Sequence, residues 1–245
     1  MGNAFLPVMA ANPDLDGCAI DFASSAIRLL HEKPAFQELV ADRGGPQGCS
    51  AHVCDITKDE IPVEALGDDG QGCDVILLLY CLSALSPETM RVAVSKLAAS
   101  LRPGGVLLFR DYGRYDEAQL RFGTGHRLAE HFYVKQDGTR VFYFTTEDLR
   151  GLMCNPPAPS TTALSTSGSN GSKESCHYSS SSNSSNSSSN SSNSSSTNNS
   201  DSLANSPGAG LEEVELSYIR RQYANRADQK ARFRVWVHGK FRKPG

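Results

Sequence analysis

The sequence predicts an α/β domain built on a doubly wound, mostly parallel sheet, and three observations predict it. Helical and strand patterns alternate through the first half of the 245 residues. Asp74–Tyr80 and Val106–Phe109 are continuous apolar runs, as expected for parallel strands buried on both faces. Residues 212–220 and 232–241 alternate apolar with polar residues, which predicts an antiparallel strand pair at the C-terminal end.

The remaining elements follow from local patterns. Those of the first half are a helix over Asn3–Ala11, a strand over Asp16–Asp21, a helix over Ser24–Glu32, a strand over Ser50–Asp55 and a helix over Pro87–Leu101. Proline suits the first turn of the last of these helices. Arg102–Gly105 is expected to be a turn. Those that follow are strands over Phe132–Val134 and Val141–Phe144, joined by a hairpin turn at Gln136–Thr139, and a helix over Thr146–Met153 with Thr146 as its cap.

A Ser/Asn-rich tract interrupts the domain. Residues 155–210 contain almost no large apolar side chains, so they cannot bury enough surface to offset the entropy of ordering. We expect this tract to be a disordered insertion in a surface loop. The folded unit is then assembled from residues 1–154 and residues 211–245.

Charge is distributed unevenly along the chain. Residues 1–105 carry 7 Lys/Arg against 14 Asp/Glu, a net charge of −7, whereas residues 211–245 carry 9 against 4, a net charge of +5. A polyanionic partner would therefore meet the C-terminal part. A solvated charged hairpin with no partner explains the same charges.

The seven cysteines form no CxxC pair and show no metal-ligand spacing with histidine, so no metal site is expected. An odd number without a signal peptide is typical of reduced intracellular thiols. No apolar run approaches the ~20 residues that cross a membrane. We therefore expect a cytoplasmic protein with no membrane association; a nuclear or mitochondrial location stays open.

Two predicted strands end in an acidic residue, Asp21 and Asp55. Ligands of doubly wound folds bind beyond the carboxyl ends of the strands, where a carboxylate accepts hydrogen bonds from ribose hydroxyls. A second carboxylate one strand further out can accept from an adenine amino group. Alternatively, each aspartate caps the turn or helix that follows it. Their separation by one βαβ unit favours a nucleoside-containing cofactor.

The strand at residues 106–109 is followed by Arg110, Asp111, Tyr112 and a glycine. A cation, a carboxylate and a ring stand where substrates of such folds bind, and a buried unpaired charge there would be costly. A purely structural Arg110–Asp111 pair that closes the sheet edge is the alternative.

Basic and aromatic residues are interleaved further along, between residues 121 and 133. Unpaired bases stack on rings while their phosphates meet Arg and Lys, so this mixture suits single-stranded or flipped nucleotides. His126 alone is explained equally well as a hydrogen-bonded structural histidine.

Several of these motifs resemble one family. The run from DVILLLYCLSALSP through FRDYGRYDEAQLRFGTGH to HFYVKQDGTRVFYFTTEDL resembles the methyltransferase-like proteins that form 3-methylcytidine in tRNA anticodon loops. The tail RVWVHGKFRK and the stretch GNAFLPVMAANPDLDGCAIDFASSAI resemble them too. The likeness spans nearly everything except the Ser/Asn tract.

The resemblance implies a class I methyltransferase (Rossmann-like) fold, S-adenosylmethionine as methyl donor and tRNA as substrate. It implies that Asp21 binds the donor's ribose and that Asp55 lies against its adenine. The further donor-site residues that it implies are Gly2, Ile56, Leu79 and Tyr80. It places Arg110, Asp111 and Tyr112 facing the target cytosine. The residues expected to contact RNA are Arg121, His126, Arg127, Tyr133, Lys135, Arg140, Arg220 and Arg221.

The chemistry sets its own demands. Cytosine N3 carries a lone pair and no proton, so its methylation needs no general base, only alignment of N3, methyl and sulfur. The ring gains positive charge, which a nearby carboxylate would stabilise; Asp111 is the candidate. Tyr112 would stack on the ring, and Arg110 would hold Asp111 or a phosphate.

The family pattern has a strand and a glycine-rich loop before the first helix. Here only Met1-Gly2-Asn3 matches the end of that loop. We therefore expect the first strand to be missing from this sequence, which would leave its two neighbours with exposed apolar edges. A sequence that starts too late is the simplest explanation, and a divergent product without activity is the alternative.

Three functions remain open from the sequence. The first is a tRNA cytosine N3-methyltransferase, and the second is a methyltransferase with a non-tRNA acceptor. The third is a catalytically silent or fragmentary RNA-binding module. Members of the family differ in whether they need an accessory protein such as an aminoacyl-tRNA synthetase, and nothing in the sequence decides that point.

Overall fold

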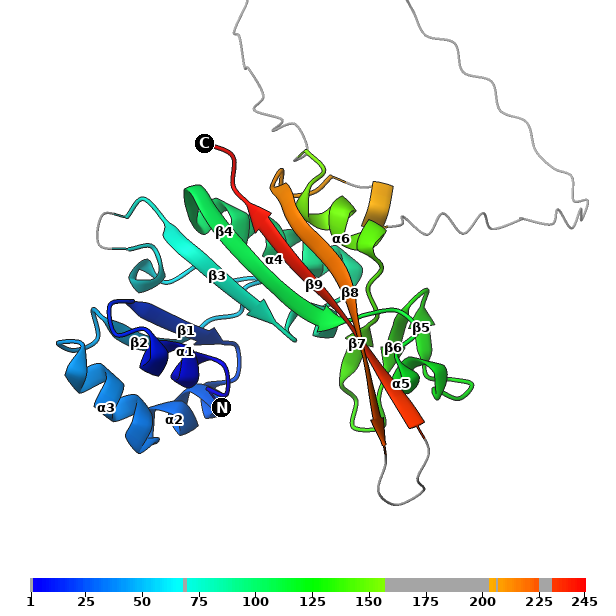
Figure 1. Ribbon diagram of the computed structural model, residues 1–245, viewed down its shortest axis with the longest axis horizontal. Helices are drawn as coiled ribbons and strands as arrows, with labels where there is room; N and C mark the ends of the chain where they lie inside the picture. The colour runs from blue at the N-terminus through cyan, green and yellow to red at the C-terminus, as the bar shows by residue number, and fades with distance from the viewer. Residues whose placement is uncertain (1, 68–69, 157–202, 206, 225–230) are drawn as a thin grey trace, which may run out of the picture. The chain divides into compact units, whose positions relative to one another are not determined.

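Four strands form the larger sheet, in the order β3-β4-β9-β8 (Figure 1). They are β3 (Cys73–Leu79), β4 (Leu101–Tyr112), β9 (Ala231–Arg242) and β8 (Glu212–Ala224). β3 is parallel to β4, whereas β9 is antiparallel to both β4 and β8. The computed structural model describes residues 2–67, 70–156, 203–205, 207–224 and 231–245. The predicted parallel pair and C-terminal antiparallel pair are confirmed.

The smaller sheet pairs β1 (Gly17–Asp21) in parallel with β2 (Cys49–Val53). Three helices accompany it: α1 (Phe5–Ala11), α2 (Ser24–His31) and α3 (Pro34–Asp42). Met9, Ile27 and Phe36 are central to the core that they share. The sequence analysis did not predict α3, although its proline at the first turn is a helix-start signal.

Two helices cover one face of the larger sheet, α4 (Pro87–Ser100) and α6 (Thr146–Met153). Leu107 and Phe109 of β4 and Val237 of β9 point into the core on this side. The cap of α6 is Thr145, whose hydroxyl accepts from the Asp148 amide, so the prediction of Thr146 as cap was one residue late.

The opposite face of the larger sheet, here called the open face, is partly exposed among the described residues. Val75 and Leu77 of β3 are 53% and 41% exposed, so the prediction that this strand is buried on both faces was wrong. Side chains alternate along a strand, and α4 covers only one side. Within the described residues β3 pairs only with β4 and β1 only with β2, so each has an unpaired edge.

A third, three-stranded sheet follows β4. It contains β5 (Arg127–Ala129), β6 (Phe132–Val134) and β7 (Arg140–Phe142), and α5 (Glu117–Leu120) precedes it. β6 and β7 form the predicted hairpin, in which Gly138 has a φ of +81°. The short elements α5 and β5 were not predicted.

Three short 3₁₀ helices complete the described fold: η1 (Val63–Ala65), η2 (Leu82–Ala84) and η3 (Leu203–Asn205). Leu203 is buried against α6, and a Cβ on Gly151 would lie 2.1 Å from its carbonyl oxygen. Thus the last part of the expected insertion, residues 155–210, packs on the folded unit. Residues 157–202 lie outside the described ranges. In the part that the structure describes, no helix is long and apolar enough to cross a membrane.

Candidate functional site

Carboxylates gather where the parallel strands end. Cys81 is the second residue after β3, and part of its surface is exposed. Desolvation by the surrounding chain is the main cause that raises the pKa of its thiol to about 11, and the negative charges of Asp111, Asp21 and Asp55 contribute to the same shift. The ends of β1, β2 and β4 therefore bring three carboxylates around one point, as expected for the carboxyl edge of such a sheet.

Asp21 and Asp55 also make the local bonds of capping residues. Asp21 Oδ1 accepts from the Ala23 amide at 2.9 Å, while no partner of its Oδ2 occurs among the described residues. Asp55 Oδ1 accepts from the Thr57 amide and hydroxyl, and its Oδ2 pairs with Lys58 at 3.0 Å. These bonds, that of the Thr57 hydroxyl first, lower the pKa of Asp55 to about 2.

The other residues predicted at the donor site lie before α1, after β2 and at the end of β3. Gly2 precedes α1 with a φ of +74°, and a Cβ there would come 2.8 Å from Leu30 Cδ1. Ile56 is buried in the main core, and Leu79 ends β3. Tyr80 has a φ of +54°, unusual for a residue with a side chain, and its amide donates to the Arg110 carbonyl oxygen.

The three residues predicted to face the target base do not share one side of the sheet. Arg110 and Tyr112 are partly exposed on the open face, whereas Asp111 is fully buried on the face covered by helices. Successive residues of a strand point to opposite faces. Asp111 therefore lies on the other side of β4 from Arg110 and Tyr112, and no Arg110–Asp111 ion pair occurs among the described residues.

Asp111 instead holds the turn that follows β3. Its Oδ2 accepts from the Ser83 amide of η2, and its Oδ1 accepts from the Tyr112 amide, both at 2.9 Å. Burial raises the pKa of this carboxyl to about 6, although the hydrogen bonds to Ser83 oppose the shift. Asp111 thus connects the end of β4 with the turn next to Tyr80.

We expect the buried carboxyl to make stability fall as pH rises. The folded chain binds this proton more tightly than the unfolded chain, whose ordinary pKa is 3.8, so the loss runs from about pH 4 to above pH 6. Between about pH 4.5 and 8, the free energy of unfolding of wild type should fall by roughly 2 kcal/mol relative to that of Asp111→Asn, which has no titrating group at position 111. Urea unfolding of both proteins measures this difference. A gap that is constant with pH would contradict the shift.

Arg110 lies between two aromatic rings on the open face. Its guanidinium carbon is 4.9 Å from the centre of the Trp236 ring and 5.9 Å from that of Tyr80. His238 is its direct partner on β9, and burial together with the charge of Arg110 lowers the pKa of His238. Arg110 Nε and His238 Nε2 are buried with no hydrogen-bond partner among the described residues.

A chain of rings leads from this point into the third sheet. Tyr80 contacts Tyr112 at 5.5 Å, and Tyr112 contacts the buried Tyr143 at 6.0 Å. Tyr143 in turn contacts Tyr133 and Phe122, at 5.8 and 6.4 Å.

Two cations lie over one ring of this chain: Lys135 Nζ and the Arg234 guanidinium are 5.7 and 5.6 Å from the centre of the Tyr112 ring. Basic and aromatic groups are therefore continuous from Tyr80 to Phe122.

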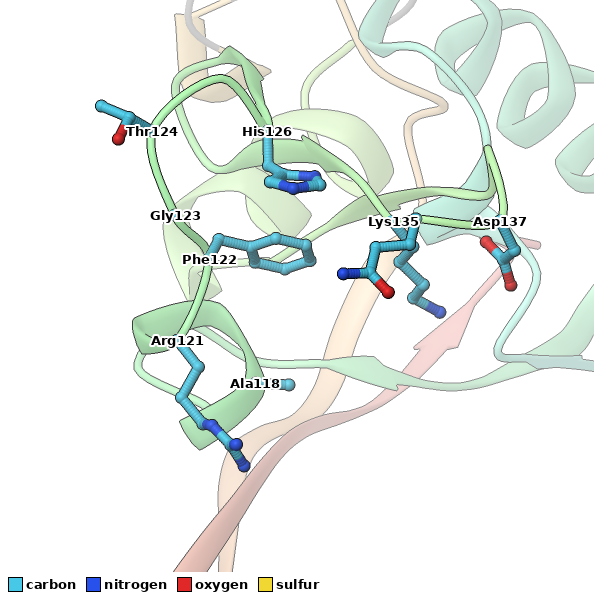
Figure 2. Close-up of a pocket in the computed structure, with 9 residues that line it drawn as sticks. Ala118, Arg121, Phe122, Gly123, Thr124, His126, Lys135 and Asp137 are labelled. Atoms are coloured by element: carbon cyan, nitrogen blue, oxygen red, sulfur yellow. The ribbon is translucent and has the colours of Figure 1, made fainter.

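Beyond these rings is a pocket of about 800 Å³, formed by α5 and the segments that follow it (Figure 2). Arg121, His126 and Lys135, three of the predicted RNA contacts, line it. One ring nitrogen of His126, Nδ1, is 2.8 Å from the Val134 carbonyl oxygen, so this histidine has the structural role that the sequence analysis left open. No group of three or more His, Cys, Asp or Glu residues able to hold a metal occurs in the described ranges.

The other predicted RNA contacts lie apart from this pocket. Arg127 borders a second, smaller pocket together with Tyr133. Arg140 lies over the Phe132 ring at 5.9 Å, and Arg220 lies over Phe233 at 4.0 Å. Arg221 is exposed on β8 opposite Arg234. The structure therefore joins only part of the predicted set.

Several residues of the site were not singled out from the sequence. Tyr143 and Trp236 supply rings, and Arg234 supplies a cation, whereas Phe122 belongs to the basic and aromatic run that the sequence does single out. Asp116 is fully buried, accepts from the Val235 amide and pairs with Arg234 at 2.8 Å. One signal was available: Asp116 with Gln119 three residues later has the pattern of a helix start, and Asp116 does cap α5.

Relatives are found along the whole chain. It is 34% identical to tRNA N(3)-cytidine methyltransferase METTL2 of Danio rerio, over 99% of this chain and 51% of that protein. It is 32% identical to Mettl2 of Drosophila melanogaster, over 100% of this chain and 56% of that protein. It is also 32% identical to METTL2B of Homo sapiens, over 100% of this chain and 48% of that protein. The chain thus spans about half the length of these curated relatives. No family model matches it.

A solved S-adenosylmethionine-dependent methyltransferase of Methanosarcina mazei matches 97% of this chain and 86% of its own length, with a TM-score of 0.49 at 12% identity. The strand order and directions decide the class. Parallel strands β3 and β4 followed by the antiparallel β9 and then β8 are the C-terminal half of a class I methyltransferase sheet, and β1 and β2 are a parallel pair from its other half. Over its whole length the chain is similar to the tRNA N(3)-cytidine methyltransferases of the METTL2 type.

Proposed function

We propose that the protein acts in S-adenosylmethionine-dependent formation of 3-methylcytidine in a tRNA anticodon loop. The observation that carries the proposal is a cluster of two rings and two cations next to the carboxylates at the strand ends. In this cluster the rings of Tyr80 and Tyr112 are in contact, Arg110 lies over Tyr80, and Lys135 lies over Tyr112. Rings accept an unpaired base, and cations accept its phosphates. The METTL2 relatives are named as methyltransferases that act on N3 of cytidine in tRNA, which supports the proposal.

The residues at the strand ends fit the methyl donor. Asp21 keeps Oδ2 available for a ribose hydroxyl, and the carboxylates around Cys81 favour a cationic ligand such as a sulfonium. Asp55 already accepts from Thr57 and pairs with Lys58. We therefore assign Asp55 to shaping the turn beside the donor site rather than to binding the donor. When bound, the donor would supply an electrophilic methyl group.

The roles of the chain's own residues follow from their positions. Tyr112 would stack on the target cytosine, since its ring is partly exposed between Tyr80 and Tyr143. Arg110, with an unpartnered Nε, would hold a phosphate. Because Asp111 is buried, we now assign it to positioning the turn at Ser83 and, through that turn, Tyr80. Alignment of the base with the methyl group is the main contribution required.

Transfer of labelled methyl from S-adenosylmethionine to unmodified tRNA tests the proposal. The chain should be assayed beside a version extended at its N-terminus through a strand and glycine-rich loop, each with and without candidate accessory proteins. We expect 3-methylcytidine from at least the extended version, and no label when the target cytosine is replaced by uridine. Label on another acceptor, or at another base, would contradict the proposal.

One alternative is a catalytically silent RNA-binding module, which the basic and aromatic surface favours equally. Binding of tRNA without methyl transfer by either version would support it. An accessory partner such as an aminoacyl-tRNA synthetase and a cytoplasmic location stay predictions.

A further inference from the structure

The pocket of Figure 2 has a flat aromatic wall. The Phe122 ring is stacked on Tyr133, with centroids 4.9 Å apart and planes 17° from parallel, and the His126 ring lies 5.8 Å from it at 45°. Behind these rings Tyr143 is buried and contacts both Phe122 and Tyr133. The wall is therefore held in place before any ligand arrives, which lowers the entropic cost of stacking one more ring.

Two cations stand at the pocket, Arg121 and Lys135. Arg121 is 3.7 Å from Glu117, but both side chains keep contact with solvent, so the pair is weak. The one carboxylate in the lining, Asp137, already accepts from the Thr139 amide. A flat wall with two available cations suits a ligand that has an aromatic ring and a negative charge, and a nucleotide has both.

The pocket is a neighbour of the proposed target site. Lys135 lines the pocket and also lies over the Tyr112 ring, 5.7 Å from its centre. The two places are joined on the other side by the contacts of Tyr143 with Tyr112 and with Phe122. The Lys135 side chain thus lies between the pocket and the Tyr112 ring. This arrangement suits two consecutive nucleotides of a single strand, one at each place.

We infer that this pocket binds an unpaired nucleotide next to the target cytosine, with its base stacked on Phe122 and its phosphate held by Arg121 and Lys135. The inference rests on the proposed function, because it takes Tyr112 as the place of the target. It makes Phe122 a recognition residue for a base that is not methylated. The pocket is large enough, since ligand pockets have typical volumes of about 300–1,000 Å³.

Fluorescence of 2-aminopurine tests the inference. The probe is an anticodon stem-loop of the substrate tRNA with 2-aminopurine at one loop position at a time, excluding the target cytosine. The protein is the same version that transfers methyl groups. Stacking quenches this base, so we expect quenching on binding at a position adjacent to the target. Substitution of Phe122 by Leu should remove the quenching and weaken binding about 5- to 10-fold, in the range of one lost stacking contact.

Gly123 offers a second variant that leaves the wall intact. A Cβ at this position would meet nothing within 4 Å, so Gly123→Ala should bind as wild type does. Gly123→Met places a longer side chain at a lining position and should abolish the quenching. Tyr223 is an exposed aromatic residue of β8 outside the pocket lining, so Tyr223→Leu is the control for the loss of an aromatic ring.

The outcomes separate the two proposals. If the stem-loop is bound and methylated but no flanking position is quenched, or if Phe122→Leu and Gly123→Met leave the quenching unchanged, the pocket inference is wrong and the proposed function stands. If no version binds the stem-loop or methylates tRNA, both are wrong. Quenching lost in both variants but kept in Gly123→Ala and Tyr223→Leu supports the inference.

Discussion

Replacement of Asp116 by Ala is expected to lower the free energy of unfolding by about 3 kcal/mol, the lower end for removing one partner of a buried ion pair. The carboxylate is fully buried, accepts from the amides of Ala118 and Val235 at 2.9 and 2.8 Å, and pairs with Arg234. The variant leaves both amides without their acceptor. Arg234 is about one-third exposed and can turn toward water, which keeps the loss at the lower end.

Chemical denaturation of wild type and variant measures this loss. Glu212→Ala is the matched control, because Glu212 and Arg242 form an ion pair at 2.8 Å at the other end of the same hairpin with half of each side chain exposed. That change should cost less than about 1 kcal/mol. Equal losses in the two variants would show that the Asp116 contacts do not hold α5 to β9.

The same contact explains how the fold positions the pocket. Arg234 on β9 holds Asp116, and Asp116 caps α5, after which Arg121 and Phe122 enter the pocket lining. Residues separated by more than 100 positions therefore determine where the aromatic wall stands. A stability loss in Asp116→Ala should accordingly be accompanied by weaker RNA binding, whereas Glu212→Ala should leave binding unchanged.

Periodicity and turn chemistry sufficed to predict most of the fold. The apolar run before Tyr80, the proline at the start of α4 and the Asp-Gly turn between β6 and β7 each predict one element, and the structure has all three. The four-residue helix α5 and the three-residue strand β5 were missed because elements so short depend on tertiary contacts more than on their own sequence.

The exposure of β3 and the position of Asp111 show what local pattern leaves undetermined. A continuous apolar run indicates a buried strand, but whether both faces are covered depends on which other segments pack there. Arg110, Asp111 and Tyr112 are consecutive, so they could not all face one substrate from a regular strand. The sequence analysis ended this strand at Phe109, so it did not apply the alternation to residues 110–112, which belong to β4 in the structure.

The ring chain could not be predicted in the same way. Trp236 lies more than 120 residues from Arg110, and they meet only because β9 inserts antiparallel between β4 and β8. Tyr143 follows a short hairpin strand, where an aromatic residue is ordinary. Its contacts with Tyr112 and Phe122 come from the packing of the third sheet against the end of β4.

Replacement of Tyr112 by Leu is expected to lower methyl transfer by about 100-fold, the loss that a displacement of roughly 1 Å at a reacting centre can cause. Leu keeps an apolar side chain against Tyr143 but removes the ring over which Lys135 and Arg234 lie. Tyr112→Phe keeps the ring, so it should retain most of the activity. The measurement is kcat/KM for 3-methylcytidine formation by the version of the protein that is active with wild-type sequence.

Tyr218→Leu makes the same change on the other face of the sheet. Tyr218 is 44% exposed on β8 and packs against Gly113, which directly follows Tyr112. It should therefore report any general effect of losing a tyrosine at the end of β4. A loss in Tyr112→Leu alone places the target base on the open face with Arg110. Equal activity in Tyr112→Leu and wild type would remove Tyr112 from the site, and an equal loss in both Leu variants would indicate damage to the sheet.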